Sequence, residues 1–154
     1  MRLKFALLCD YADLFMGKHL TIVGVGDGWQ VAPDSPPRQP VNIQPHSLVV
    51  RLGASVGEIG PHTMRLRLLD DDGQDVFGVN LNFMIGEPAG MVPGIELTHT
   101  NCARLENLAL PGHGGYVWEI VVDEQRLGEL PFHVIPAPAP PPQEEAKQPI
   151  PGVE

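Results

Sequence analysis

The sequence is poor in basic residues: 10 Lys and Arg stand against 19 Asp and Glu, which gives a formal net charge of −9. An acidic chain repels phosphate backbones, and binding to nucleic acid depends on several clustered Lys and Arg contacts. The only basic clusters are Arg2 with Lys4 and Arg65 with Arg67. We therefore expect no nucleic-acid partner.

Long hydrophobic runs are also missing. No run approaches the roughly 18–20 residues that span a membrane, so no membrane partner is expected. The opening MRLKFALLCD has too short an apolar stretch for a secretory signal, and Asp10 ends it. Its residues alternate instead, with Leu3, Phe5 and Leu7 on one side, which is the period of a strand. We interpret this stretch as mature protein and expect a cytoplasmic location.

Cysteine is scarce, and the two that occur, Cys9 and Cys102, lie far apart in the sequence. In a cytoplasmic protein we expect them to be buried thiols that pack as small hydrophobic side chains. A disulfide is the less favoured alternative, because it needs the two Cα atoms within about 7 Å. Asp10 and Asp13 place negative charge near Cys9, which disfavours a reactive thiolate there.

Complete motifs for catalysis, nucleotides or metals are absent from the sequence. GVGDGW, at residues 24–29, lacks the third glycine of a nucleotide-binding loop, so its glycines are interpreted as allowing strand curvature or a bulge. There is no G-x-S-x-G elbow, and His99 with Cys102 supplies too few ligands for zinc. We predict no catalytic residue, no cofactor and no metal site.

The segment DDDGQD, Asp70 to Asp75, is the only dense cluster of carboxylates. Its aspartates are consecutive and Gly73 stands fourth, whereas a calcium-binding loop has alternating ligands and a later glycine. We interpret the segment as the solvated tip of a hairpin. Weak binding of a cation is the alternative.

Turn residues, in contrast, are abundant: the chain has 17 Gly and 17 Pro between short stretches of alternating hydrophobicity. Two hairpins stand out. In residues 62–85 the turn DDDG joins two alternating strands, and Asn80 and Asn82 fall on the wet face of the second strand. Residues 116–135 form another predicted hairpin, joined near residues 124–125.

Other segments give weaker patterns. Residues 18–31 are predicted as a strand bent at its glycines, and residues 46–54 as a further strand. Residues 32–45 contain too many prolines for a central strand and are predicted as a surface connection between sheets. Residues 95–110 carry one strand or two, with a helical turn as one interpretation of residues 102–108.

Short strands with regular turns indicate an all-β fold. We predict an antiparallel β-sandwich of about seven to nine strands, Greek-key and immunoglobulin-like, with a closed barrel as the alternative. Residues 1–135 are expected to form this single domain. Residues 136–154 have few apolar side chains to bury, so we predict a disordered Pro-rich tail with polyproline character.

Four stretches resemble a family of small bacterial proteins of unknown function: FALLCDYADLFMGKHLTIVGVGD, HSLVVRLGA, RLRLLDDDGQDV and PGHGGYVWEIVVDEQRLGELPFHV. In that family a Gly-Lys turn and an apolar strand ending Gly-x-x-Asp follow the opening strand, and a Gly-Tyr hairpin closes the domain. The resemblance covers about residues 1–135 and implies a β-sandwich without catalytic residues. Gly26 departs from the family pattern, which has an aromatic or aliphatic residue there.

Strong structural patterning without a catalytic constellation favours a non-enzymatic protein that acts through protein contacts, as a subunit or adaptor, with the Pro-rich tail as a recruiting segment. The alternative is a small-ligand or carbohydrate-binding sandwich that uses Asn80 and Asn82 or adjoining loops, with Trp29 as the one aromatic candidate for stacking. A hydrolase is the least favoured class. No ligand-binding residues, partner identity or oligomeric state follow from the sequence.

Overall fold

The computed structural model describes residues 1–15, 19–32, 36–88, 90, 92 and 94–138, and this part of the chain contains eleven strands, one short 3₁₀ helix and no α-helix. The 3₁₀ helix is η1 (Val56–Glu58). The strands are β1 (Arg2–Phe15), β2 (His19–Gly26), β3 (Gly28–Val31), β4 (Val41–Ile43), β5 (His46–Ala54), β6 (Gly60–Asp70), β7 (Asp75–Ile85), β8 (Leu97–Leu105), β9 (Leu108–Leu110), β10 (Gly114–Val122) and β11 (Gln125–Pro136).

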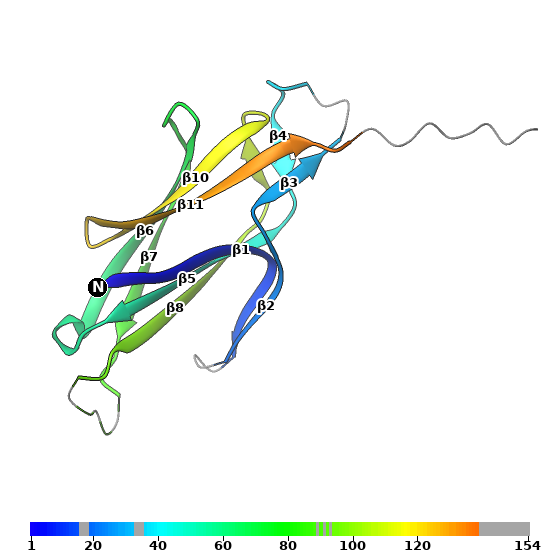
Figure 1. Cartoon of the computed structure of the whole chain (residues 1–154). Helices are drawn as coiled ribbons and strands as arrows, with labels where there is room; N and C mark the ends of the chain where they lie inside the picture. Colours follow the sequence, from blue (N-terminus) through cyan, green and yellow to red (C-terminus); the bar gives the residue numbers. More distant parts are fainter. Residues whose placement is uncertain (16–18, 33–35, 89, 91, 93, 139–154) are drawn as a thin grey trace, which may run out of the picture.

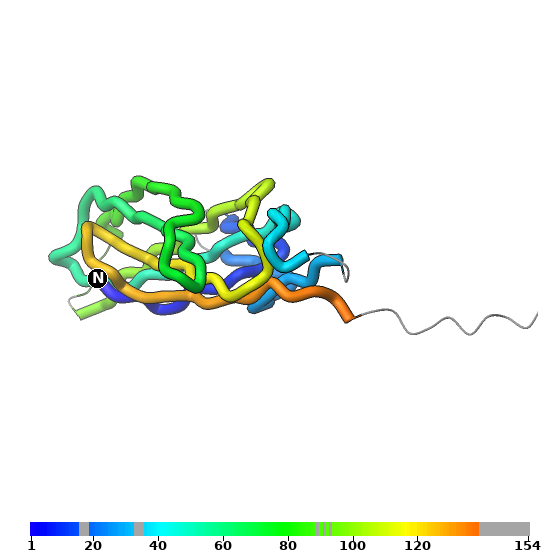
Figure 2. The backbone as a smooth tube through the Cα atoms, turned by 90° about the horizontal axis from the view of Figure 1, so that it is seen from above, coloured from blue at the N-terminus to red at the C-terminus, as the bar shows by residue number. Residues whose placement is uncertain are grey.

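Two sheets pack face to face, which confirms the predicted all-β sandwich (Figure 1). One sheet has the order β2-β1-β5-β8, and the other has the order β3-β11-β10-β6-β7. All pairs are antiparallel except β3 with β11, and β4 and β9 form a separate small pair. Seen from above, β11 runs beside β1 along one side of the sandwich (Figure 2).

The strand order is that of an immunoglobulin-like sandwich. β1, β5 and β8 take the places of strands A, B and E, and β7-β6-β10-β11 take those of C′-C-F-G. Tyr116 lies at the start of β10 and is 3% exposed, and its hydroxyl donates a hydrogen bond to the carbonyl of Gly112 at 2.7 Å. This contact is the tyrosine corner that such sandwiches have before strand F.

Alternation brings one face of each central strand into a shared core. Within the predicted hairpins, the odd and even positions separate as expected, with Trp118 fully buried at the centre of β10. Each fully buried side chain of this size contributes roughly 1.5–3 kcal/mol relative to exposure. The central core side chains are Leu48, Val50, Leu52, Met64, Leu66, Leu68, Trp118, Ile120, Val122, Phe132 and Val134.

The turn of the second hairpin also agrees with the prediction. Asp123 and Glu124 adopt positive φ angles of 48° and 66° between β10 and β11. Two consecutive residues with positive φ are what a tight two-residue hairpin turn requires, because its twist then matches the twist of the strands.

The helical turn predicted for residues 102–108 is wrong. β8 continues to Leu105, and β9 begins at Leu108. Asn107 makes the bend between them with φ 56°, a conformation that asparagine tolerates better than most residues. Leu105, Leu108 and Leu110 are all buried. They belong to the end of β8 and to β9, and not to one face of a helix.

Two connections differ in detail from the prediction. Residues 32–45 were expected as a surface connection, but they contain β4, whose Val41 and Ile43 are buried where β4 pairs with β9. A strand of only three residues is short enough to fit between the prolines of this segment. Of the strand predicted over residues 18–31, residue 18 lies outside the described residues, and residues 19–31 divide into β2 and β3 around Asp27, with β3 in the opposite sheet.

β11 is the last strand of the described chain. β11 ends at Pro136, and the Ala137 amide donates a hydrogen bond to the carbonyl of Val31 at 2.8 Å. The predicted tail begins at residue 136, and its residues 139–154 lie outside the described residues.

The tyrosine corner gives a stability prediction. Tyr116→Phe keeps the ring but leaves the Gly112 carbonyl without its partner, so we expect the free energy of unfolding to fall by roughly 1–3 kcal/mol. Tyr11→Phe is the matched control, because Tyr11 is 47% exposed and should change stability by less than about 0.5 kcal/mol. Urea unfolding of the full chain measures both, and equal effects of the two substitutions would contradict the assigned role.

A second prediction concerns the start of β1. Arg2 donates two hydrogen bonds to Glu96 at 2.7 and 3.0 Å, and Lys4 also pairs with this carboxylate. The Arg2 hydrogen bond, followed by that of Lys4, lowers the pKa of Glu96 to about 2. Because the folded-state pKa lies below the ordinary value, the contact stabilises the fold above about pH 4.5 and is lost as the pH falls towards 2.

Glu96→Gln should therefore be less stable than the wild type at pH 7, with a difference that shrinks between about pH 4.5 and pH 2. Urea unfolding over this pH range checks the expectation. Because the groups are exposed, the difference should also decrease with added salt. A difference that stays constant over the whole range would show that the carboxylate charge is not involved.

Candidate functional site

β1 is longer than the sheet that it belongs to. Its last partner in β5 is Ser47, which lies opposite Cys9, and β5 begins only one residue earlier. Beyond this point Tyr11–Phe15 pair only with His19–Val23. These two segments, called here the β1–β2 ribbon, extend past the last residue pair between β1 and β5, and β1 bends there (Figure 1).

The ribbon and the adjoining part of β2 expose large apolar side chains on one face. Tyr11 lies opposite Val23, and the exposed fractions of these two side chains are 47% and 54%. Val25, at 65%, and Phe15, at 62%, extend this face in both directions. Four of the ten exposed large hydrophobic residues in the described part of the chain thus lie on one hairpin. Contiguous exposed apolar surface is typical of interaction sites.

The free edge of β2 lacks the features that usually protect an edge strand. β2 pairs only with β1, and no residue from Leu20 to Gly26 is charged or proline. Edge strands in soluble proteins commonly carry such residues to prevent pairing with other chains. The long edge strands at the opposite sides of the sheets are more polar: β8 has Thr98, Thr100, Asn101 and Arg104, and β7 has Asp75, Asn80 and Asn82.

A cleft of about 480 Å³ opens beside β2, between β1, β3 and β4. Among the described residues that line it, Asp10 is the one with a carboxylate, and Asn42 and Gln44 also belong to the lining. Among the described residues, no ion pair engages Asp10. The apolar residues that line the cleft include Leu8, Cys9, Trp29, Val31, Ala32, Val41 and Ile43.

Glycines form the β2 wall of this cleft. Gly24 has φ 68°, and a Cβ atom at this position would overlap the carboxylate of Asp10. Gly26 has no such constraint, because the nearest atom to an added Cβ would be the Gly28 carbonyl oxygen at 4.0 Å. The sequence interpretation of GVGDGW as a place of strand curvature therefore agrees with the end of β2 and the start of β3.

Trp29 is partly held by the core. Its ring centroid lies 4.6 Å from that of His46 and 5.1 Å from that of Phe132. His46 is 1% exposed, and burial lowers its pKa, so its ring is neutral and its Nδ1–H donates to the carbonyl of Gln44 at 3.0 Å. Trp29 is therefore fixed in orientation and exposes only part of its ring to the cleft.

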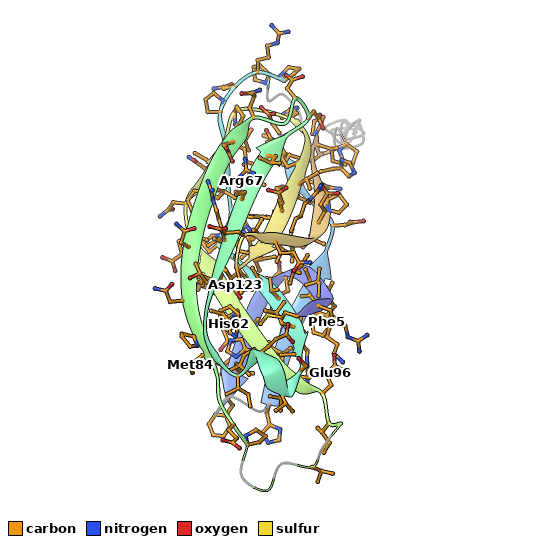
Figure 3. All side chains as sticks on the ribbon, turned by 90° about the vertical axis from the view of Figure 1, so that its left-hand side faces the viewer. Phe5, His62, Arg67, Met84, Glu96 and Asp123 are labelled. Atoms are coloured by element: carbon orange, nitrogen blue, oxygen red, sulfur yellow. The ribbon has the colours of Figure 1, made fainter. Side chains whose placement is uncertain are left out.

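The polar face predicted around Asn80 and Asn82 lies elsewhere. These side chains line a shallow hollow of about 940 Å³ on the outside of the five-stranded sheet, together with Arg65 and Arg67. Arg67 is engaged by Asp75 at 2.9 Å and by Glu119 at 2.8 Å, and Figure 3 shows it on this face. Trp29 belongs to β3 at the far edge of the same sheet, so the structure does not bring it together with the asparagines.

The acidic turn uses its carboxylates within the fold. Asp70 accepts hydrogen bonds from the amides of Asp72 and Gln74 at 3.0 and 2.8 Å. Asp71 accepts one from the amide of Gly115 at 3.0 Å. Within the described ranges no group of three His, Cys, Asp or Glu side chains is placed to hold a metal ion.

The cysteines face outward from the four-stranded sheet. Cys9 lies in β1 and Cys102 in β8, with β5 between them. Two strand spacings give roughly 10 Å between their backbones, which exceeds the reach of a disulfide, and both thiols are free. Burial is the main cause that raises the pKa of each thiol. Asp10 lies on the opposite face of β1 from Cys9, so the two do not form a reactive pair.

His99 is half-buried, and it stacks on Phe83 with a centroid distance of 4.6 Å. Phe83 in turn stacks on His62, whose Nδ1 lies 2.6 Å from the carboxylate of Asp123 (Figure 3). His99 and Cys102 are three residues apart in one strand and so point to opposite faces. This arrangement links the two sheets and supplies no zinc site.

Together, these features define the class of the protein: an immunoglobulin-like β-sandwich whose first hairpin extends past β5 and borders a cleft. Residues 4–135 match the model of a family described as "Family of unknown function (DUF6941)". The chain belongs to this family, which confirms the resemblance to a family of unknown function. No curated protein matches the chain.

Two solved structures are similar to parts of the chain. One is a β-glucuronidase from glycoside hydrolase family 2, with a TM-score of 0.34 and 14% identity over 64% of this chain and 11% of that one. The other is a candidate β-galactosidase from Bacteroides fragilis, with a TM-score of 0.30 and 16% identity over 64% of this chain and 16% of that one. Similarity at this level says nothing about activity. Among the described residues no helix could span a membrane.

The cleft wall gives a prediction with a matched control. Gly24→Ala forces a side chain into a left-handed conformation and against Asp10, so we expect a loss of roughly 1–3 kcal/mol in the free energy of unfolding. Gly26→Ala has open space and an ordinary φ, so it should leave stability unchanged or raise it by up to about 1 kcal/mol. Thermal or urea unfolding distinguishes the two, and a reversed order would contradict the described wall.

Proposed function

We propose that this protein is a non-enzymatic binding module that docks an extended segment of a partner protein along the free edge of β2. The observation that carries the proposal is the β1–β2 ribbon, which exposes apolar side chains beside an uncharged edge strand. An edge strand presents unpaired backbone donors and acceptors, so an added strand gains main-chain hydrogen bonds along its whole length.

The length and position of β2 support this mode of binding. β2 has eight residues, enough for several ladder hydrogen bonds. A partner strand beside it would cover Val23 and Val25, whose burial supplies affinity, while side-chain contacts supply specificity. The ribbon itself would gain a third strand, and a two-stranded hairpin without such support is marginal in water.

A cytoplasmic location is part of the proposal. Two free thiols that are far from disulfide geometry suit a reducing compartment. A carbohydrate ligand on the polar face near Asn80 and Asn82 is the second candidate, supported by the hollow there. It is less favoured because the hollow has no aromatic lining among its described residues, and sugars commonly stack on such side chains.

Peptide selection tests the proposal. Random peptides of about ten residues, displayed on phage, are selected against the full chain, and one selected peptide is titrated by fluorescence anisotropy. We expect Val25→Lys and Val25→Glu each to weaken its binding by at least about tenfold, because either charge would be desolvated under the added strand. Using both signs separates the apolar contact from charge attraction.

Thr100→Lys is the control, since it places the same lysine on β8 at the opposite edge of the same sheet. It should change the affinity by less than about twofold. If both Val25 variants bind the peptide as the wild type does, or if selection yields no peptide that Val25 substitutions affect, docking at β2 is contradicted.

A further inference from the structure

We propose that the segment docked on β2 alternates apolar with basic side chains, and that one basic side chain enters the cleft and pairs with Asp10. This inference rests on the proposed function, because it specifies the chemistry of the partner that β2 receives. It gives the cleft a ligand class, the ammonium group of a lysine or the guanidinium group of an arginine, presented by an extended chain.

The two faces of the second half of β2 differ in the size of their side chains. Val23 and Val25 lie on the outer face, and Gly24 and Gly26 alternate with them on the inner face. A strand added beside β2 would place its own side chains alternately next to the valines and next to the glycines. The apolar side chains of the added strand would pack against the valines. Next to the glycines no β2 side chain stands in the way, so a long side chain can reach into the cleft.

The cleft offers the groups that a cationic head group needs. Asp10 brings a carboxylate that lies over Gly24 and has no ion-pair partner in the described part of the chain. Asn42 and Gln44 also line the cleft, and residues of this type have oxygens that accept hydrogen bonds from N–H donors. Trp29 brings part of an indole ring, the aromatic group best suited to attract a cation. The apolar floor suits the methylene stem of Lys or Arg.

Negative charge exceeds positive charge in the first hairpin. From Cys9 to Asp27 the sequence has three aspartates, Asp10, Asp13 and Asp27, and one basic residue, Lys18, which lies outside the described residues. The whole chain has a formal net charge of −9. A basic segment is therefore attracted to this hairpin over distances comparable with the Debye length, and an acidic segment is repelled.

The same charges argue against two other occupants of the edge. A second copy of the chain, paired through β2, would bring two sets of these aspartates together, which is unfavourable. The chain's own C-terminal segment, residues 136–154, has a single basic residue, Lys147, and its many prolines lack the N–H that a ladder requires. A basic extended segment of another protein fits the site better than either.

Three synthetic peptides test the inference. All have the same apolar residues at alternate positions, and the intervening positions are all Lys, all Gln or all Glu. Anisotropy titrations use the full wild-type chain, Asp10→Asn and Asp13→Asn. We expect the wild type to bind the Lys peptide at least about tenfold more tightly than the Gln peptide, and the Glu peptide most weakly. Sedimentation of the same samples reports self-association of the chain.

Asp10→Asn should reduce the preference for Lys over Gln to within about threefold, because the cleft loses its carboxylate. Asp13→Asn removes an equal charge from the outer face of the ribbon and should largely keep the preference. Gly26→Val, which fills the space beside the cleft, should weaken the Lys peptide more than the Gln peptide. Unfolding curves confirm that each variant is folded. If Asp10→Asn does not fold, Gly26→Val still tests whether the basic side chain enters the cleft.

The outcomes distinguish a failure of the basic specificity from a failure of docking at β2. Equal binding of the Lys and Gln peptides to the wild type, with both weakened by Val25→Lys, overturns the basic specificity and leaves docking at β2 intact. A preference that Asp10→Asn leaves unchanged also overturns the assignment of Asp10. If no peptide binds in a way that Val25 substitutions affect, or if the chain pairs only with itself through β2, both the inference and the proposed function fail.

Discussion

The burial of one face of each sheet is the constraint on which the rest of the structure depends. β5 goes beyond it, because both of its faces are buried from His46 to Ala54 except at Arg51, and it lies between β1 and β8. Across the core, β10 contributes Trp118, which is as fully buried as the core residues of β5. The alternating pattern that fills this core does not stop where the opposing sheet stops. β1 continues with the same period past its last contact with β5, and there the apolar side chains meet solvent.

That continuation is what gives the fold a candidate interface. In the core, alternation separates a buried face from a wet face, whereas in the β1–β2 ribbon it exposes an apolar face next to an unprotected edge. On β2 the alternation is also one of size, since valines occupy one face and glycines the other. The glycines leave this side of β2 open to a cleft. The carboxylate of Asp10 occupies the space that a Cβ atom at position 24 would fill. One periodic pattern thus accounts for the core, the edge and the cleft.

Local chemistry was enough to predict some of this fold and too little to predict the rest. The two long hairpins follow from turn residues and period-two patterns within 24 residues or fewer, and both are confirmed. β4 and β9 were missed because three residues are too few for a period to show. Leu105 and Leu108 have a spacing that also suits a helix, and only the pairing of β9 with β4 decides between the two. The ribbon could not be recognised, because Tyr11 and Val23 look like core residues until the register places Cys9 opposite Ser47. The contact between Asp10 and Gly24 likewise depends on this pairing.

Backbone amide hydrogen exchange of β2, compared between the free chain and the chain saturated with a selected peptide, tests the central claim most directly. If β2 is the docking edge, the amides of β2 that have no partner in β1 should exchange rapidly in the free chain and become protected in the complex. The amides of β8 should exchange at the same rate in both samples. Protection at β8, β7 or β3 with none at β2 would contradict the account, because the partner would then be using an edge other than the one that the hairpin exposes.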